Sequence, residues 1–242
     1  MDSNGAMPDR SPVLVIAAHP DDEVLGCGGT IARLARIGHD VHIAILGEGA
    51  TSRHASRDQL ATEAVRTLEG QSKEVARFLG AKGIHTHDLP DNLFDTVPLL
   101  QIAKLIEGAI DLIKPEVVYT HHAGDLNVDH SLTHRATLIA TRPMFDSPVK
   151  DLYAYEVPSS TDWVFSNVGP AFRPNVFVDI ADTLTQKVEA MQLYESEARE
   201  FPHPRSREAL VANAQRWGSV AGVYAAEAFE LVRSVPRTRS KL

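Results

Sequence analysis

One imidazole and three carboxylates stand within five residues near the start of the chain. His19 is followed by Pro20, Asp21, Asp22 and Glu23. Three acids this close together repel one another strongly unless a cation neutralises them, and imidazole and carboxylate groups are common ligands of zinc. The spacing therefore predicts a metal site, with His19 and Asp22 as two of its ligands.

A second group of imidazoles and carboxylates occupies the stretch His121–His130. His130 would supply the third ligand, because zinc in hydrolytic sites commonly has three protein ligands and an open position for water. Asp129 could accept a hydrogen bond from a ligand histidine, at the ring nitrogen that does not bind the metal. The first cluster then keeps Asp21 as a spare carboxylate, which can act as the general base that takes a proton from the water.

The elements that must position these clusters follow an alternating pattern. Apolar, β-branched runs predict buried strands, and amphipathic stretches between them predict helices. This alternation indicates an α/β fold with a mostly parallel sheet and helices on both faces, and it brings both clusters to the carboxyl ends of strands. The expected strands are 13–16, 41–46, 84–89, 116–121, 152–156 and 176–180, and the expected helices are 24–37, 58–79, 98–113, one from about 131, 180–198 and 206–232.

A simpler interpretation exists for the first cluster. Aspartates before a helix are often N-caps, and acids in a first helical turn are favoured by the helix dipole. One aspartate alone would be interpreted as a cap. His19 and the second cluster favour the metal site instead.

Composition limits the function classes. The net charge of −8 argues against nucleic acid or an anionic membrane as a partner. One cysteine excludes an intramolecular disulfide and a cysteine-based zinc cage. We see no signal peptide and no apolar run of about 18 residues, so we expect a cytoplasmic protein without a membrane span. We expect a disordered tail at 1–11, one domain at 12–235 and a second tail at 236–242.

The two clusters resemble the LmbE/PIG-L family of zinc-dependent N-acetylglucosamine deacetylases. The resemblance implies a Rossmann-like α/β fold, one Zn²⁺ per chain, and removal of an N-acetyl group from an amino sugar or its conjugate. By motif position, the zinc ligands would be His19, Asp22 and His130, with Asp21 as the base. The residues that carry the resemblance are Ala18–Glu23 and Asn127–His130, with support from Pro90–Asn92, Pro202–Ser206 and Ala226–Phe229.

One position departs from the pattern of several family branches. Their second motif begins with a histidine that polarises the acyl oxygen, whereas this chain has Asn127. An amide can donate a hydrogen bond to an oxyanion, but it cannot carry positive charge or shuttle a proton. Either Asn127 alone polarises the acyl oxygen, or His122 or another imidazole takes the place of the missing histidine. With Asp21 and Asn127, Asp129 completes the set of expected catalytic residues.

Candidate substrate contacts come from the loops. Asp91 and Asn92 stand in a polar loop after the third strand, and Arg53 aligns loosely with a substrate-contacting arginine of the family. Arg205 is either a solvated charge near a helix start or a group that binds a polar substrate. His122 completes the set of candidate contacts.

Two other function classes stay open. Carboxylate-rich turns also hold Mg²⁺, so a magnesium-dependent phosphoesterase is the alternative enzyme, although histidine ligands favour zinc. A non-catalytic sugar- or nucleotide-binding protein on the same scaffold is the third. The expected partner is a small N-acetylated amino sugar or conjugate, and several helical faces could pack against a second copy in a homo-oligomer.

Overall fold

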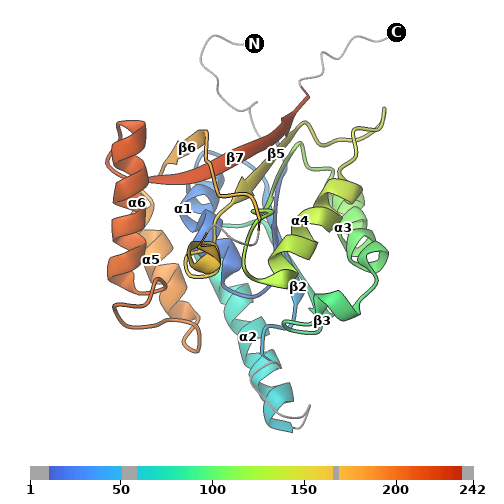
Figure 1. The fold of residues 1–242 in the computed structure, drawn as a ribbon, viewed down its shortest axis with the longest axis horizontal. Coiled ribbons are helices and arrows are strands. Elements are labelled where there is room, and N and C mark those ends of the chain that lie inside the picture. Colours follow the sequence, from blue (N-terminus) through green and yellow to red (C-terminus); the bar gives the residue numbers. More distant parts are fainter. Residues whose placement is uncertain (1–10, 51–58, 166–168, 236–242) are drawn as a thin grey trace.

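The computed structural model describes residues 11–50, 59–165 and 169–235 (Figure 1). Within these ranges seven strands form one sheet, and six α-helices and two short 3-10 helices connect them. The strands are β1 (Val13–Ala17), β2 (Val41–Gly47), β3 (Gly83–Leu89), β4 (Val117–His121), β5 (Asp151–Tyr155), β6 (Val176–Asp179) and β7 (Ala226–Ser234). The helices are α1 (Asp22–Arg36), α2 (Gln59–Phe78), η2 (Phe94–Thr96), α3 (Leu99–Ile113), α4 (Val128–Ala140), η3 (Asp162–Val164), α5 (Leu184–Leu193) and α6 (Arg207–Ala221).

The sheet has the strand order β3-β2-β1-β4-β5-β7-β6. Its first five strands are parallel, and β7 runs antiparallel to both of its neighbours, β5 and β6. The chain order reverses between β1 and β4, which are hydrogen-bonded neighbours. Open α/β sheets bind ligands at such a switch point, beyond the carboxyl ends of the strands.

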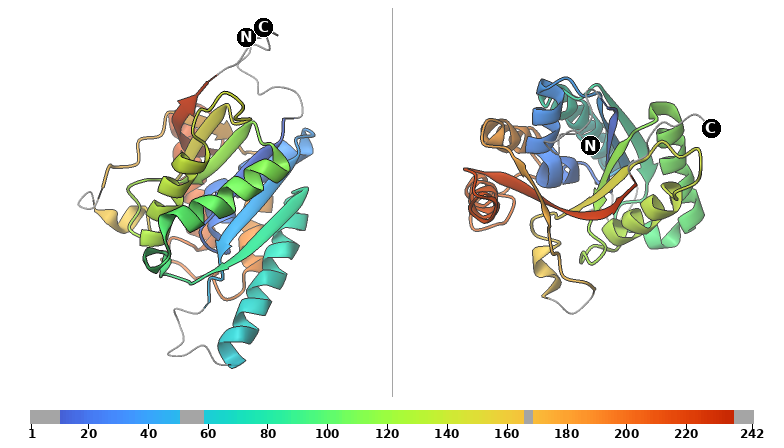
Figure 2. Two further views of the ribbon diagram at one scale, coloured as in Figure 1. Left: turned by 90° about the vertical axis from the view of Figure 1, so that its right-hand side faces the viewer. Right: turned by 90° about the horizontal axis from the view of Figure 1, so that it is seen from above.

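Helices cover both faces of the sheet, as expected (Figure 2). On one face, α1, α2 and α5 bury a cluster that includes Val15, Ile43 and Met191. On the other, α3 and α4 bury a second cluster with Leu14, Ile16 and Ile106. Alternate residues of β1 thus enter different cores, which explains why its sequence is apolar throughout.

A buried ion pair between α5 and β7 holds α1 in place. The Glu227 carboxylate accepts hydrogen bonds from the backbone N–H groups of Gly29 (3.0 Å) and Thr30 (2.7 Å). The Lys187 ammonium donates to Glu227 at 2.6 Å and to the carbonyl oxygen of Leu25 at 2.8 Å. Removal of either charged partner would leave an uncompensated buried charge, so the pair specifies where α1 lies against α5 and β7.

Two expected helices differ from the structure. The helix expected over 206–232 ends at Ala221, where Gly222 has a φ of 75°, and the chain returns as strand β7. Alanine and glutamate in this segment favour a helix locally, but Ala226 and Ala228 pack beside Trp217 while Phe229 enters the opposite core. Pairing with β5 and β6 overrides the local preference.

The helix expected over 180–198 is also shorter, because α5 spans only Leu184–Leu193. The other expected elements are found with small shifts at their ends, and α4 begins at Val128 rather than near 131. None of the helices in the described ranges is long and apolar enough to cross a membrane. The expected tails, 1–11 and 236–242, lie outside the described residues apart from Ser11.

The close packing of α1 on β5 gives a stability prediction. A methyl group at Gly26 would overlap the ring of Tyr155, which is fully buried and whose hydroxyl donates to the carbonyl oxygen of Ile16 at 2.7 Å. We expect Gly26→Ala to lower the free energy of unfolding by about 1–3 kcal/mol in urea titrations. Gly108→Ala is the control, because open space surrounds that helical glycine and alanine there should stabilise by about 0.5–1 kcal/mol. Equal effects of the two substitutions would contradict the packing argument.

Candidate metal centre

The candidate metal centre lies where the carboxyl ends of β1 and β4 meet the first turns of α1 and α4. His19 follows β1, Asp22 begins α1, and His130 lies in the first turn of α4. All three are buried, with 9%, 1% and 2% of their surfaces exposed. The sheet topology thus brings together side chains more than a hundred positions apart in the sequence.

One nitrogen from each histidine points toward the Asp22 carboxylate. Oδ2 of Asp22 lies 3.4 Å from Nδ1 of His19 and 3.3 Å from Nε2 of His130. One ligand atom of each residue lies within 4.8 Å of the other two. Two imidazoles and one carboxylate form a donor set that suits Zn²⁺ with one position left for water.

The second nitrogen of each imidazole is held by a buried carboxylate. Nε2 of His19 lies 2.9 Å from Oδ2 of Asp129, whose Oδ1 accepts the backbone N–H of Phe94. Nδ1 of His130 lies 3.1 Å from Oδ1 of Asp125. Such outer carboxylates fix the orientation of a ligand histidine and raise its basicity.

A second group of potential ligands shares His19. It combines that imidazole with Asp91 and Asp129. Both oxygens of Asp129 already accept hydrogen bonds, from His19 and from the Phe94 backbone. We therefore assign more weight to the group of His19, Asp22 and His130, in which the ligand atoms converge and the opposite nitrogens are fixed.

His121 contacts the centre without offering a ligand. Its Nε2 accepts the backbone N–H of Ala18 at 2.8 Å and lies 3.1 Å from the hydroxyl of Tyr155. Its ring stacks on that of His130, with centroids 4.0 Å apart. Burial and the nearby charge of His130 keep its pKa well below the usual range, so His121 is a neutral ring that supports His130.

The charges of the centre are coupled. Burial opposes protonation of His19, but hydrogen bonds to Asp129 and Asp22 outweigh it and raise the pKa of His19 to about 10. Burial likewise opposes protonation of His130, and the carboxylates of Asp22 and Asp125 raise its pKa to about 9. Without a metal, the two imidazoles therefore carry the positive charge that compensates the buried acids at neutral pH.

Asp21 precedes Asp22 in the turn before α1, but its carboxylate points toward Arg205 rather than toward the imidazoles. Its Oδ2 accepts a hydrogen bond from Nη1 of Arg205 at 2.5 Å, and the same nitrogen lies 3.3 Å from Oε2 of Glu197. Burial raises the pKa of Asp21 to about 8, and Arg205 opposes that shift. The guanidinium therefore contacts two buried carboxylates, so Arg205 is neither solvated nor directed only at a substrate.

A cavity of about 100 Å³ opens onto the centre. It is lined by most of the polar residues that the sequence identified and by two that it did not, Ser160 and Glu197. The lining residues are His19, Pro20, Asp21, Gly49, Asp91, Asn92, Asn127, His130, Ser160, Glu197 and Arg205. Asn127 caps α4 by accepting the N–H of Asp129 through Oδ1, and its Nδ2 donates to Asn92 at 3.0 Å. One Nδ2 hydrogen remains for a ligand.

One candidate contact, His122, is not brought to this cavity. His122 is buried, with Nδ1 2.7 Å from the Glu230 carboxylate and Nε2 2.8 Å from the carbonyl oxygen of Pro170. It lines a different cavity, beside Trp217. Both ring nitrogens of His122 are thus occupied by Glu230 and Pro170 rather than directed at the candidate metal ligands. Arg53 lies outside the described residues.

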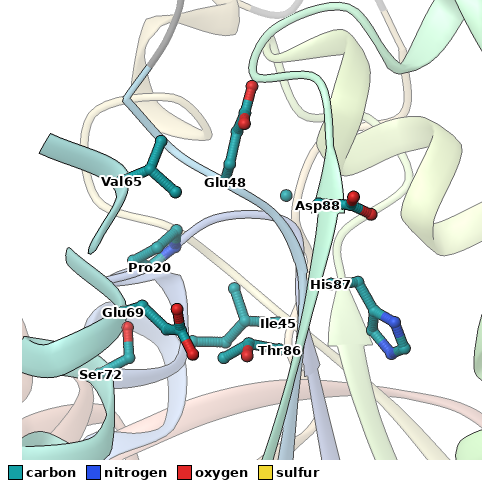
Figure 3. Close-up of a pocket in the computed structure, with 10 residues that line it drawn as sticks. Pro20, Ile45, Glu48, Val65, Glu69, Ser72, Thr86, His87 and Asp88 are labelled. Carbon is teal, nitrogen blue, oxygen red and sulfur yellow. The ribbon is translucent and has the colours of Figure 1, made fainter. Parts of the chain in front are cut away.

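A cavity of about 330 Å³ contains none of the candidate metal ligands (Figure 3). It lies between α2 and the β2–β3 edge, where Glu69 and Ser72 face Ile45 and Thr86. It shares only Pro20 with the cavity at the metal centre. Cavity size alone therefore does not select the candidate metal centre, whose own cavity is smaller.

Sequence reasoning missed Asp125, Ser160 and Glu197. Asp125 stands within the second cluster, and its place five residues before His130 was the available signal. Ser160 Oγ donates to Asp125 at 3.1 Å, and Thr161 Oγ1 donates to the same carboxylate at 2.6 Å. No pattern in the sequence linked Ser160 or Glu197 to the clusters.

The contact between Asp125 and His130 yields a prediction about metal affinity. Asp125→Asn keeps the shape of the side chain but removes the charge that orients the His130 ring. We expect the affinity for Zn²⁺ to fall about 10–100-fold, measured by competition with a chromophoric chelator. The exposed Asp182→Asn substitution is the control. Unchanged affinity in Asp125→Asn would exclude this role.

The raised histidine pKa values predict that metal binding releases protons. Ligand imidazoles must be neutral, and at pH 7 the metal-free centre holds protons on His19 and His130, whose pKa values are about 10 and 9. Zinc binding at pH 7 should therefore release about two protons, and the apparent affinity should rise with pH up to about 10, the pKa of His19. Calorimetry in buffers of different ionisation enthalpy measures this number. Uptake of protons, or no exchange, would contradict the arrangement.

Curated proteins with related sequences are named as deacetylases. The diacetylchitobiose deacetylase of Thermococcus kodakarensis is 30% identical over 243 aligned positions, which cover 94% of this chain and 85% of the relative. The 1D-myo-inositol 2-acetamido-2-deoxy-alpha-D-glucopyranoside deacetylase of Mycobacterium sp. (strain JLS) is 27% identical over 235 positions, covering 80% of this chain and 76% of the relative.

Solved structures share the fold. The N,N'-diacetylchitobiose deacetylase of Pyrococcus horikoshii superposes with a TM-score of 0.74 at 22% identity, over 93% of this chain and 85% of that one. The 4-carboxy-2-hydroxymuconate hydratase GalB of Pseudomonas putida superposes with a TM-score of 0.68 at 21% identity, over 96% and 99% of the two chains. The α/β fold is confirmed, and by itself it does not determine the reaction.

Residues 14–141, just over half of the chain, match the family profile described as PIG-L, GlcNAc-PI de-N-acetylase. This segment contains β1 apart from Val13, β2 to β4, both clusters and all three candidate ligands. The chain therefore belongs to the PIG-L family.

Proposed function

We propose that the protein is a zinc-dependent hydrolase that removes the N-acetyl group of an amino sugar or amino-sugar conjugate. The observation that carries the proposal is the convergence of His19, Asp22 and His130. Two of these candidate ligands, His19 and His130, line one cavity together with the spare carboxylate of Asp21. The related deacetylases and the family membership support this reaction class. The two imidazole donors favour Zn²⁺ over Mg²⁺.

In this proposal the zinc ligands and Asp21 have separate roles in the reaction. A zinc ion held by His19, Asp22 and His130 would polarise the acyl carbonyl and lower the pKa of a water molecule to about 7. Asp21 accepts the proton of that water and returns it to the leaving amine. A pKa near the working pH suits both steps, and burial raises that of Asp21 to about 8.

The remaining cavity residues bind and orient the substrate. Asn127 replaces the histidine found in several family branches, and its amide donates to the developing oxyanion without carrying charge. Asp91 and Asn92, in the β3–η2 connection, offer acceptors and a donor to sugar hydroxyls. Asp129 and Asp125 do not contact the metal in this proposal; they hold the imidazoles of His19 and His130 in place.

The substitution Asp21→Asn tests the general base. We expect full zinc content and a fall in kcat of at least about 100-fold, because the amide cannot accept the proton. Acetate release from a panel of N-acetylated amino sugars and their conjugates gives the rates, and elemental analysis gives the metal content. Asp182→Asn, on the exposed surface, should keep full activity. Full activity in Asp21→Asn would refute the assignment.

The wild-type protein tests the reaction class. Acetate release that stops on chelation and returns with Zn²⁺ supports the deacetylase. Zinc-loaded protein that releases no acetate from the whole panel would overturn it. A parallel panel of phosphate esters with Mg²⁺ tests the alternative enzyme.

A further inference from the structure

Asp21 has a backbone conformation that L-residues rarely adopt. Its φ is 104° and its ψ is −27°, in the left-handed region. Asp21 also occupies the N-cap position of α1, where an aspartate side chain normally accepts a hydrogen bond from the helix. Its carboxylate makes no such bond and contacts Arg205 instead. The conformation is strained, so neighbouring groups must maintain it.

Glu23 is bonded to the backbone at the strained position. Its Oε2 accepts the N–H of Asp21 at 3.1 Å, and its Oε1 accepts the hydroxyl of Tyr194 at 2.6 Å. Glu23 and Tyr194 both have 0% of their surface exposed. A buried carboxylate is costly unless it is hydrogen-bonded, so both bonds are needed for Glu23 to stay in this place.

The geometry of the turn shows what this arrangement achieves. Consecutive carboxylates must point in different directions, with that of Asp22 among the imidazoles and that of Asp21 in the cavity beside Arg205. The unusual φ of Asp21 separates the two directions. The N–H of Asp21 then faces Glu23, and its carbonyl oxygen accepts from Val24 and Leu25 in the first turn of α1.

We propose that Glu23 and Tyr194 are positioning residues, which hold the backbone of Asp21 in its strained conformation and so direct the Asp21 carboxylate into the cavity. The role of that carboxylate as a base rests on the proposed function, but the backbone part of the inference does not. Tyr194 directly follows α5, so this helix anchors the turn from 171 positions away. Ser72 of α2, which lines the cavity in Figure 3, interacts with the same hydroxyl.

A stability cycle at positions 21 and 23 tests the backbone part without any activity. Glycine adopts a positive φ freely, whereas alanine there is strained. Asp21→Gly should therefore be more stable than Asp21→Ala in urea while Glu23 is present. In the Glu23→Ala background the turn can relax, and the order should reverse, because glycine then contributes only its greater entropy in the unfolded chain.

The cycle has a clear adverse outcome. An unchanged difference between glycine and alanine in the two backgrounds would overturn the proposal. If the Glu23→Ala chain does not fold, Tyr194→Phe replaces it as the background, and the glycine–alanine difference should then shrink. Glu23→Gln is the conservative variant: its amide oxygen can still accept the N–H of Asp21, so the difference should persist.

A kinetic arm uses the chain with Asp21 intact. Tyr194→Phe should lower kcat about tenfold while KM and bound zinc stay unchanged, because the base is misdirected but the ligands are intact. Tyr224→Phe, at a tyrosine that is 70% exposed, is the control and should change neither value. Loss of zinc in parallel with activity, or an unchanged kcat, would overturn the positioning role. A wild-type protein without deacetylase activity would refute the proposed function, while the stability cycle would still decide the backbone part.

Discussion

One buried carboxylate organises the candidate metal centre. Oδ2 of Asp22 accepts the backbone N–H of His19 at 2.8 Å and lies within 3.5 Å of three imidazoles, those of His19, His121 and His130. An isolated charge buried to this degree would be prohibitively costly. The carboxyl ends of β1 and β4 and the start of α4 must therefore meet around Asp22, and displacement of any of them would leave its charge uncompensated.

The three candidate ligands could be predicted from the sequence because local signals fixed their positions. His19 and Asp22 follow an apolar strand directly, and His130 follows another. In a parallel sheet all such ends lie at one edge, so the strand pattern alone brings the two clusters together. The chemistry of the side chains then limits the metal. Neither step required knowledge of contacts between distant residues.

The rest of the centre depends on contacts that leave no periodic signal. Arg205 reaches Asp21 across 184 positions, and its segment alone was equally compatible with a solvated charge. Tyr194 could not be linked to Glu23, because nothing in a helical pattern indicates which hydroxyl will meet a buried acid. The prediction of a helix through 206–232 was wrong at β7 for the same reason. The sequence of β7 favours a helix locally, but its pairing with β5 and β6 makes it a strand.

Asp21 and Asp22 are neighbours of the same residue type whose environments separate their properties. Burial would raise the pKa of both. For Asp22, burial is outweighed by the charged imidazole of His130 and by hydrogen bonds to His130 and His19, which hold the pKa well below its usual range, so this candidate ligand stays charged. For Asp21, burial prevails over Arg205 and raises the pKa to about 8. Two carboxylates with opposite shifts can act as a permanent anion and as a proton acceptor. The strained turn between them allows adjacent positions in the chain to lie in such different surroundings.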